Sequence, residues 1–63
     1  MTNERIATLA VEANAIEREV RTAASGAEEQ DDQAMATAVL RQTIALRKAL
    51  EAWIVSRATR AQR

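Results

Sequence analysis

The stretch SGAEEQDDQ, residues 25–33, interrupts the hydrophobic pattern of this 63-residue chain and decides how it folds. It contains the single glycine, Gly26, followed by a polar run with four carboxylates. Glycine and clustered polar residues end helices and favour turns. We therefore predict two helices joined by a turn at about residues 25–31.

On the N-terminal side of this stretch, apolar residues recur at alternating spacings of three and four. The seam consists of Ile6, Leu9, Ala13, Ile16, Val20 and Ala23. This is the spacing of the a and d positions of a heptad, which share one face of a helix. It predicts a helix over residues 3–24, capped by Thr2 or Asn3. Glu17 lies off the seam and is expected to pair with Arg21 one turn later.

The C-terminal side carries an equally regular seam in a different phase. It consists of Ala36, Val39, Thr43, Leu46, Leu50 and Trp53. The pattern predicts a helix over residues 32–60. Continuing the first seam would place Arg41 and Lys48 in the core, so one uninterrupted coiled coil cannot bury both seams. The sequence therefore predicts an antiparallel hairpin.

The residues around the turn suggest where each helix ends. Gly26 fits the left-handed position that follows a helix C-terminus. Asp31 or Asp32 can cap the next helix, because acids are favoured at its positive end. Ser25 and Glu28 also match a capping box, which would start the second helix near residue 26. We prefer the later start, since it leaves a short connection typical of helical bundles.

The size of the chain makes a partner chain the leading structural expectation. With 63 residues there is room for one domain, residues 1–63, and a lone core of this size is marginal. The chain has no cysteine or histidine, so neither disulfides nor the usual zinc and haem ligands can support it. The second helix has further apolar residues beside its seam, which fits burial on two sides. We expect an all-α fold, a two-helix antiparallel hairpin that assembles into a four-helix bundle or a coiled-coil-like dimer. The predicted dimer or partner interface is Val39, Leu40, Leu46, Leu50, Trp53 and Ile54.

Charge is divided between the two halves of the chain. Residues 1–32 hold eight acidic and three basic residues, whereas residues 33–63 hold six basic residues and one acidic residue. Opposite charge on two helices favours their lying side by side. The basic residues could alternatively contact phosphates of a nucleic acid. The candidates for that contact are Arg41, Lys48, Arg57, Arg60 and Arg63.

Several classes of chemistry lack their usual residues. Without histidine, cysteine or tyrosine, the common nucleophile–base pairs are absent, and no glycine-rich phosphate loop is present. The acidic pairs of the turn are expected to be solvated, and they lack the pattern of a calcium loop. We therefore expect no enzyme activity, no cofactor, no metal site and no small-molecule substrate. The N-terminus has no signal-peptide pattern and no apolar run reaches the length of a membrane span, so we expect a cytoplasmic bacterial protein.

The start Met1-Thr2 and the acidic turn Glu28-Glu29-Gln30-Asp31 give the chain a partial resemblance to a known family. In design it resembles the Rop family of plasmid copy-number regulators, short cysteine-poor helical hairpins that dimerise into four-helix bundles. Those proteins hold paired RNA loops with basic and aromatic residues of the first helix. Here the first helix is acidic and has no aromatic residue, so the resemblance does not imply that RNA contact.

The sequence thus predicts a small non-enzymatic protein–protein interaction module, a homodimeric or complex-subunit hairpin of the adaptor or regulator type. Its expected partner is itself, another helical protein, or both. The alternative is a nucleic-acid-binding regulator, a Rop-like bundle that uses a basic second helix.

Overall fold

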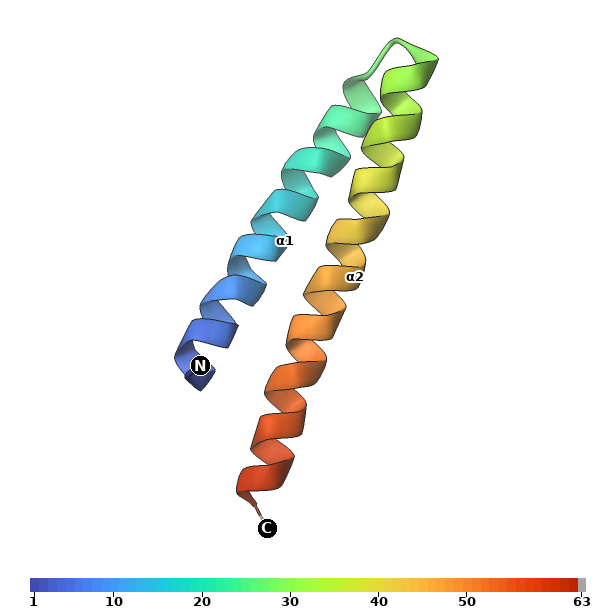
Figure 1. The fold of residues 1–63 in the computed structure, drawn as a ribbon. Helices are drawn as coiled ribbons and strands as arrows, with labels where there is room; N and C mark the ends of the chain where they lie inside the picture. The colour runs from blue at the N-terminus through green and yellow to red at the C-terminus, as the bar shows by residue number, and fades with distance from the viewer. Residues whose placement is uncertain (63) are drawn as a thin grey trace.

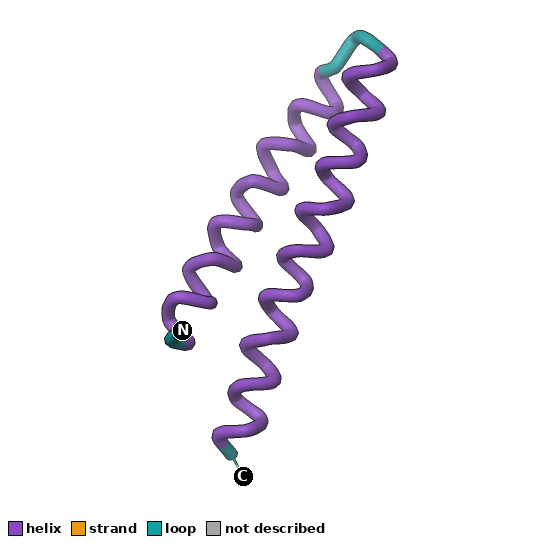
Figure 2. The backbone as a smooth tube through the Cα atoms, viewed as in Figure 1, coloured by secondary structure: helices purple, strands orange, loops and turns teal. Residues whose placement is uncertain are grey.

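A computed structural model describes residues 1–62, in which both regular elements are helices. Helix α1 spans Asn3–Gly26 and helix α2 spans Gln30–Ala61. The two run antiparallel, packed along their lengths, and form a rod of 51 × 15 × 14 Å (Figure 1). Figure 2 shows the short loop that joins them. The predicted all-α architecture with two mutually packed helices is confirmed.

The connection is shorter than predicted, because each helix extends two residues further into it. Gly26 is the last residue of α1 and does not have a positive φ angle, so the predicted left-handed helix end is wrong. Instead, Ala27 takes an extended conformation (φ −72°, ψ 125°), which breaks the helical hydrogen bonding without a glycine. The side chain of Gln33 donates to the Ala27 carbonyl at 2.6 Å and ties the connection to α2.

The caps at the start of α2 also differ from those predicted. Glu29 occupies the N-cap position and its side chain makes no capping hydrogen bond. Asp31 and Asp32 lie in the first turn, where their charge favours the positive end of the helix. The alternative capping box is wrong, since Ser25 lies inside α1.

Thr2 caps α1 as one of the two predicted caps, its hydroxyl accepting from the Arg5 amide at 3.1 Å. Replacing Thr2 by alanine should lower the free energy of unfolding by about 1 kcal/mol, because the amide loses its partner. Thr8→Ala is the matched control, since the Thr8 hydroxyl donates to a carbonyl within the helix and caps nothing. Thermal melts followed by circular dichroism measure the difference. Equal melting temperatures for the two variants would contradict the assigned cap.

The contact between the helices uses only half of each predicted seam. The buried or half-buried residues that face the other helix recur with alternating spacings of four and three. In α1 they are Ile6, Ala10, Ala13, Glu17, Val20 and Ala24, and Leu9 is half-buried beside them at a d position. In α2 they are Ala36, Leu40, Thr43, Arg47, Leu50, Ile54 and Arg57. In heptad terms these are the a and e positions, whereas the sequence predicted a and d.

The prediction that the following d-position seam residues are buried between the two helices is wrong. Ile16, Ala23, Val39, Leu46 and Trp53 are exposed. The physical reason is that each helix carries an apolar stripe wider than one contact, and a single neighbour covers only one side of it. Glu17, predicted to lie off the seam, takes an e position within it.

The core of the hairpin is correspondingly small. Ile6, Ala13 and Leu50 form its buried apolar cluster, and Leu9, Ala10 and Ile54 pack against it. Trp53, a predicted seam residue, is exposed, whereas its neighbour Ile54 packs against the cluster.

Candidate interaction face

The five large apolar residues at the d positions, which are exposed or half-buried, form one side of the hairpin. We call this side the open face; it comprises Leu9, Ile16, Val39, Leu46 and Trp53. Ile16 is 49% exposed, Leu46 53% and Trp53 38%, which are high values for large apolar side chains. Because these residues lie along both helices, the face extends over much of the length of the rod.

Two shallow grooves connect four of the five residues of the open face, all except Trp53. Leu9 and Ile16 of α1 line a groove of about 220 Å³ together with Leu46 of α2. Leu46 also lines a second groove of about 300 Å³ beside Val39 and Thr43. Since Leu46 belongs to both, the exposed residues of the two helices lie on the same side of the molecule.

The open face has no charged residue along most of its α2 half. The heptad positions that flank the d column on its outer side are Met35, Ala38, Gln42, Ala45, Ala49, Ala52, Ser56 and Thr59. All of these are exposed and uncharged. A broad exposed helix surface without charge is typical of a protein contact, because charged residues are depleted in the centres of interfaces.

The opposite flank of the helix contact is held by ion pairs. Glu17 accepts from Arg47 at 2.7 Å across the two helices, and from Arg21 at 3.0 Å within α1. Arg47 also binds Glu51 at 3.0 Å within α2. The four residues form a chain of alternating charge, with the Glu17 residue only 9% exposed. The predicted pair of Glu17 with Arg21 is confirmed.

The link between Glu17 and Arg47 was missed by the sequence reasoning. Neither residue belongs to the predicted apolar seams, and the two are thirty positions apart. Seams with spacings of four and three, rather than three and four, counted from Ile6 in the first half and from Ala36 in the second, place Glu17 and Arg47 at e positions. Each neutralises the other, which allows charged groups at a helix contact.

The pKa of Glu17 is held below its ordinary value. The main cause is the hydrogen bond from Arg47, helped by the positive charges of Arg47 and Arg21 and opposed by burial. The same interactions raise the pKa of Arg47. A carboxylate with a lowered folded-state pKa stabilises the fold above its ordinary pKa and ceases to do so as the pH falls through the lowered value.

Acidification should therefore weaken the hairpin. We expect the melting temperature to fall as the pH drops below about 4.5, the ordinary pKa of the group, because protonated Glu17 no longer attracts Arg47. Glu17→Gln should melt lower at neutral pH and lose less on acidification. Glu19→Gln, which removes an exposed carboxylate from the same helix, is the control and should behave like the wild type. Identical pH profiles for Glu17→Gln and Glu19→Gln would refute this role.

The candidate nucleic-acid contacts do not form one stripe. Arg41 and Lys48 are exposed on the outer side of α2, seven residues apart. Arg57 is half-buried and donates to the Asn3 side chain. Arg60 shares a recess of about 390 Å³ with Asn3 and Arg57 at the open end of the hairpin. Arg63 lies outside the described residues.

The predicted interface residues fall into two groups. Leu40, Leu50 and Ile54 belong to the contact between α1 and α2, whereas Val39, Leu46 and Trp53 lie on the open face. The second group is the one available to another chain.

Residues 1–62 contain no cluster of three or more acidic side chains arranged to hold a metal ion. Over the same residues, neither helix is long and apolar enough to cross a bilayer. In comparisons with known proteins, no family model, curated protein or solved structure matches the chain.

Proposed function

We propose that this chain is a non-enzymatic protein–protein interaction module of the adaptor or regulator type, and that it binds through the open face. The observation that carries the proposal is a run of apolar side chains on one side of both helices. Ile16, Val39, Leu46 and Trp53 are exposed there, and Leu9 is half-buried beside them. Apolar side chains gathered on one face of a small protein mark an interaction surface.

The total surface supports the same proposal. The hairpin exposes 4947 Å². A compact monomer of 6.9 kDa would expose about 4000 Å². The excess of about 900 Å² is close to the area that one partner contributes to a standard protein interface, about 800 Å². The hairpin therefore has enough exposed surface to supply one side of a standard interface.

The nucleic-acid alternative has less support. Arg41 and Lys48 lie on a different side of α2 from Arg57, and Arg57 is engaged with Asn3. The chain has no net charge, which weakens a general attraction to phosphate.

Affinity purification from the cells that make the protein tests the proposal. Tagged wild-type chain should retain a protein, either untagged copies of itself or another chain, that Leu46→Glu loses. Val11→Glu is the matched control, because it adds the same charge at an exposed position on the outer side of α1. Recovery of the same proteins by wild type and Leu46→Glu, or recovery of nucleic acid that depends on Arg41 and Lys48, would contradict it.

A further inference from the structure

The open-face column of α2 is bounded by charged residues of opposite sign. At seven-residue intervals the d positions of this helix are Asp32, Val39, Leu46, Trp53 and Arg60. All five are exposed. Along the column, an acidic residue is followed by three apolar residues and then by a basic residue. The apolar and charged residues are therefore placed symmetrically about Leu46, and the charges at the two ends are opposite.

From this we infer that the partner on the open face is a second copy of the chain, packed antiparallel about an axis through Leu46. The inference rests on the proposed function and names its partner. A two-fold axis perpendicular to the helices places Leu46 against Leu46 of the second copy. It also places Val39 against Trp53 of the second copy, and Asp32 against Arg60 of the second copy. Each of these last two contacts occurs twice, as in any isologous interface.

The first helix has its own column centred on the same axis. Its d positions are Leu9, Ile16 and Ala23, with Ile16 in the middle. Ile16 and Leu46 line the same groove, so they lie at the same level of the rod. One axis therefore centres the exposed columns of both helices, which joins four helices around a shared core.

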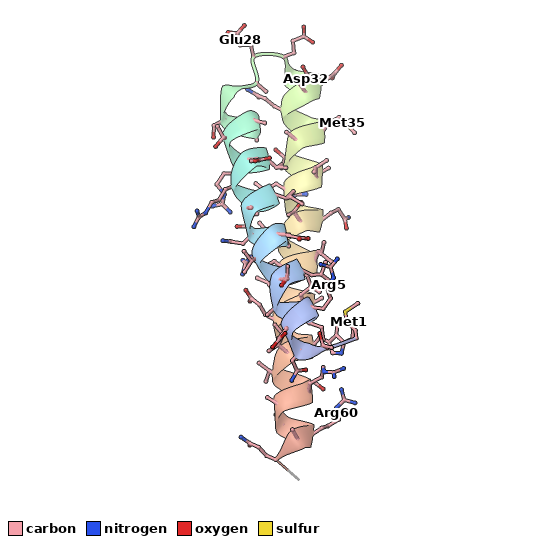
Figure 3. The ribbon with its side chains drawn as sticks, turned by 90° about the vertical axis from the view of Figure 1, so that its left-hand side faces the viewer. Met1, Arg5, Glu28, Asp32, Met35 and Arg60 are labelled. Carbon is pink, nitrogen blue, oxygen red and sulfur yellow. The ribbon has the colours of Figure 1, made fainter. Side chains whose placement is uncertain are left out.

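Charge along the rod distinguishes the antiparallel arrangement from a parallel one. The turn end carries Glu28 and Asp32, and the opposite end carries Arg60, as Figure 3 shows. The same view shows Met35, Arg5 and Arg60 directed to one side of the hairpin. A parallel dimer would bring the two acidic turns together and the two basic ends together. An antiparallel dimer places each acidic turn beside a basic end, which selects one orientation.

The alanine positions beside the column fit the same packing. Ala45, Ala49 and Ala52 surround the centre of the α2 face, and all are exposed. Small side chains allow two helices to approach closely and leave room for large neighbours such as Leu46 and Trp53.

Disulfide trapping tests the register, since the chain has no cysteine of its own. Leu46→Cys should form an intermolecular disulfide on mild oxidation, because the axis brings the two thiols together. Val39→Cys alone should not, since its mate lies about 21 Å away along the helix, beyond the reach of a disulfide. A mixture of Val39→Cys and Trp53→Cys chains should give the mixed dimer. Val11→Cys on the outer side controls for random collision.

The trapping results separate the arrangements. Efficient self-crosslinking of Val39→Cys would overturn the antiparallel register in favour of a parallel dimer. A Leu46→Cys chain that crosslinks no better than Val11→Cys would overturn the second copy as the partner.

Charge reversal tests the ends of the column. Asp32→Arg or Arg60→Asp should raise the dimer dissociation constant by about two- to thirtyfold, because each weakens two ion pairs. Combining Asp32→Arg with Arg60→Asp should restore it. Arg41→Asp, on the outer side of α2, should leave it unchanged. Failure of the double variant to recover, with both single variants weakened, would overturn the pairing of Asp32 with Arg60.

The failure of this inference differs from failure of the proposed function. A purified chain that stays monomeric, while tagged chain retains a different protein that Leu46→Glu loses, would overturn the second copy and leave the open face as an interaction surface. If Leu46→Glu still forms the dimer and still retains the same proteins as the wild type, both this inference and the proposed function are overturned.

Discussion

Leu50→Asp should abolish the folded hairpin. Leu50 is buried in the helix contact with Ile6 and Ala13, and it occupies the a position shared by the inner contact and the open face. The change removes the leucine from the core and places an unpaired carboxylate there, which costs about 4 kcal/mol or more. That is a large part of the stability of a small domain. Circular dichroism should show loss of the cooperative thermal transition.

Val55→Asp is the matched control for this prediction. It introduces the same charge into α2, but at a position that is exposed on the outer side of the helix. Its helicity and melting temperature should stay close to those of the wild type. A Leu50→Asp chain as helical and as stable as Val55→Asp would mean that the two helices do not pack through this residue.

Ile6→Ala should produce the second-largest loss. Ile6 is 0% exposed, the most completely buried side chain of the described residues. Truncating it leaves a cavity in a cluster of only three buried apolar residues, and such changes lower the free energy of unfolding by about 2–5 kcal/mol. The measurement is urea unfolding followed by circular dichroism.

Val11→Ala serves as its control on the same helix. Val11 is exposed, and alanine has the higher helix propensity, so this variant should match the wild type or exceed it slightly. Equal stabilities for Ile6→Ala and Val11→Ala would contradict the core described here.

Heptad periodicity was enough to predict two helices and their separation near residue 26, because a change of phase cannot be buried in one continuous coil. Periodicity also identified Ile6, Ala13 and Leu50, which occupy the a positions used by every contact. Periodicity could not predict whether the neighbouring helix packs against the d positions or the e positions of each apolar stripe. On the e side, Glu17 pairs with Arg47 across the helices, a non-local polar contact that an apolar pattern does not reveal.

The same ambiguity between the d and e sides explains why the predicted interface residues fall into two groups. Val39, Leu46 and Trp53 were predicted to face a partner as well as to form the seam, and the structure places them on the open face. Leu40 and Ile54 were predicted to face a partner but lie against α1. An apolar stripe that includes the a, d and e positions predicts which residues avoid water. Which neighbouring helix covers the d side and which covers the e side depends on tertiary packing.

The turn was predicted at the right place with the wrong chemistry. Gly26 and Ser25 both carry strong local signals for a helix boundary, yet both remain helical. The bond from Gln33 to Ala27 and the extended backbone at Ala27 provide the ending instead. Local propensities at a boundary are a fraction of a kcal/mol to about 1 kcal/mol and yield to the packing of the helices on either side.

Sedimentation equilibrium of the purified wild-type chain, from the nanomolar to the high micromolar range and with helicity followed in parallel, tests the central claim most directly. We expect twice the 6.9 kDa mass of one chain at high concentration, with helicity falling as dilution separates the two copies. A mass of one chain at every concentration, with full helicity retained, would contradict the claim that a second copy covers the open face.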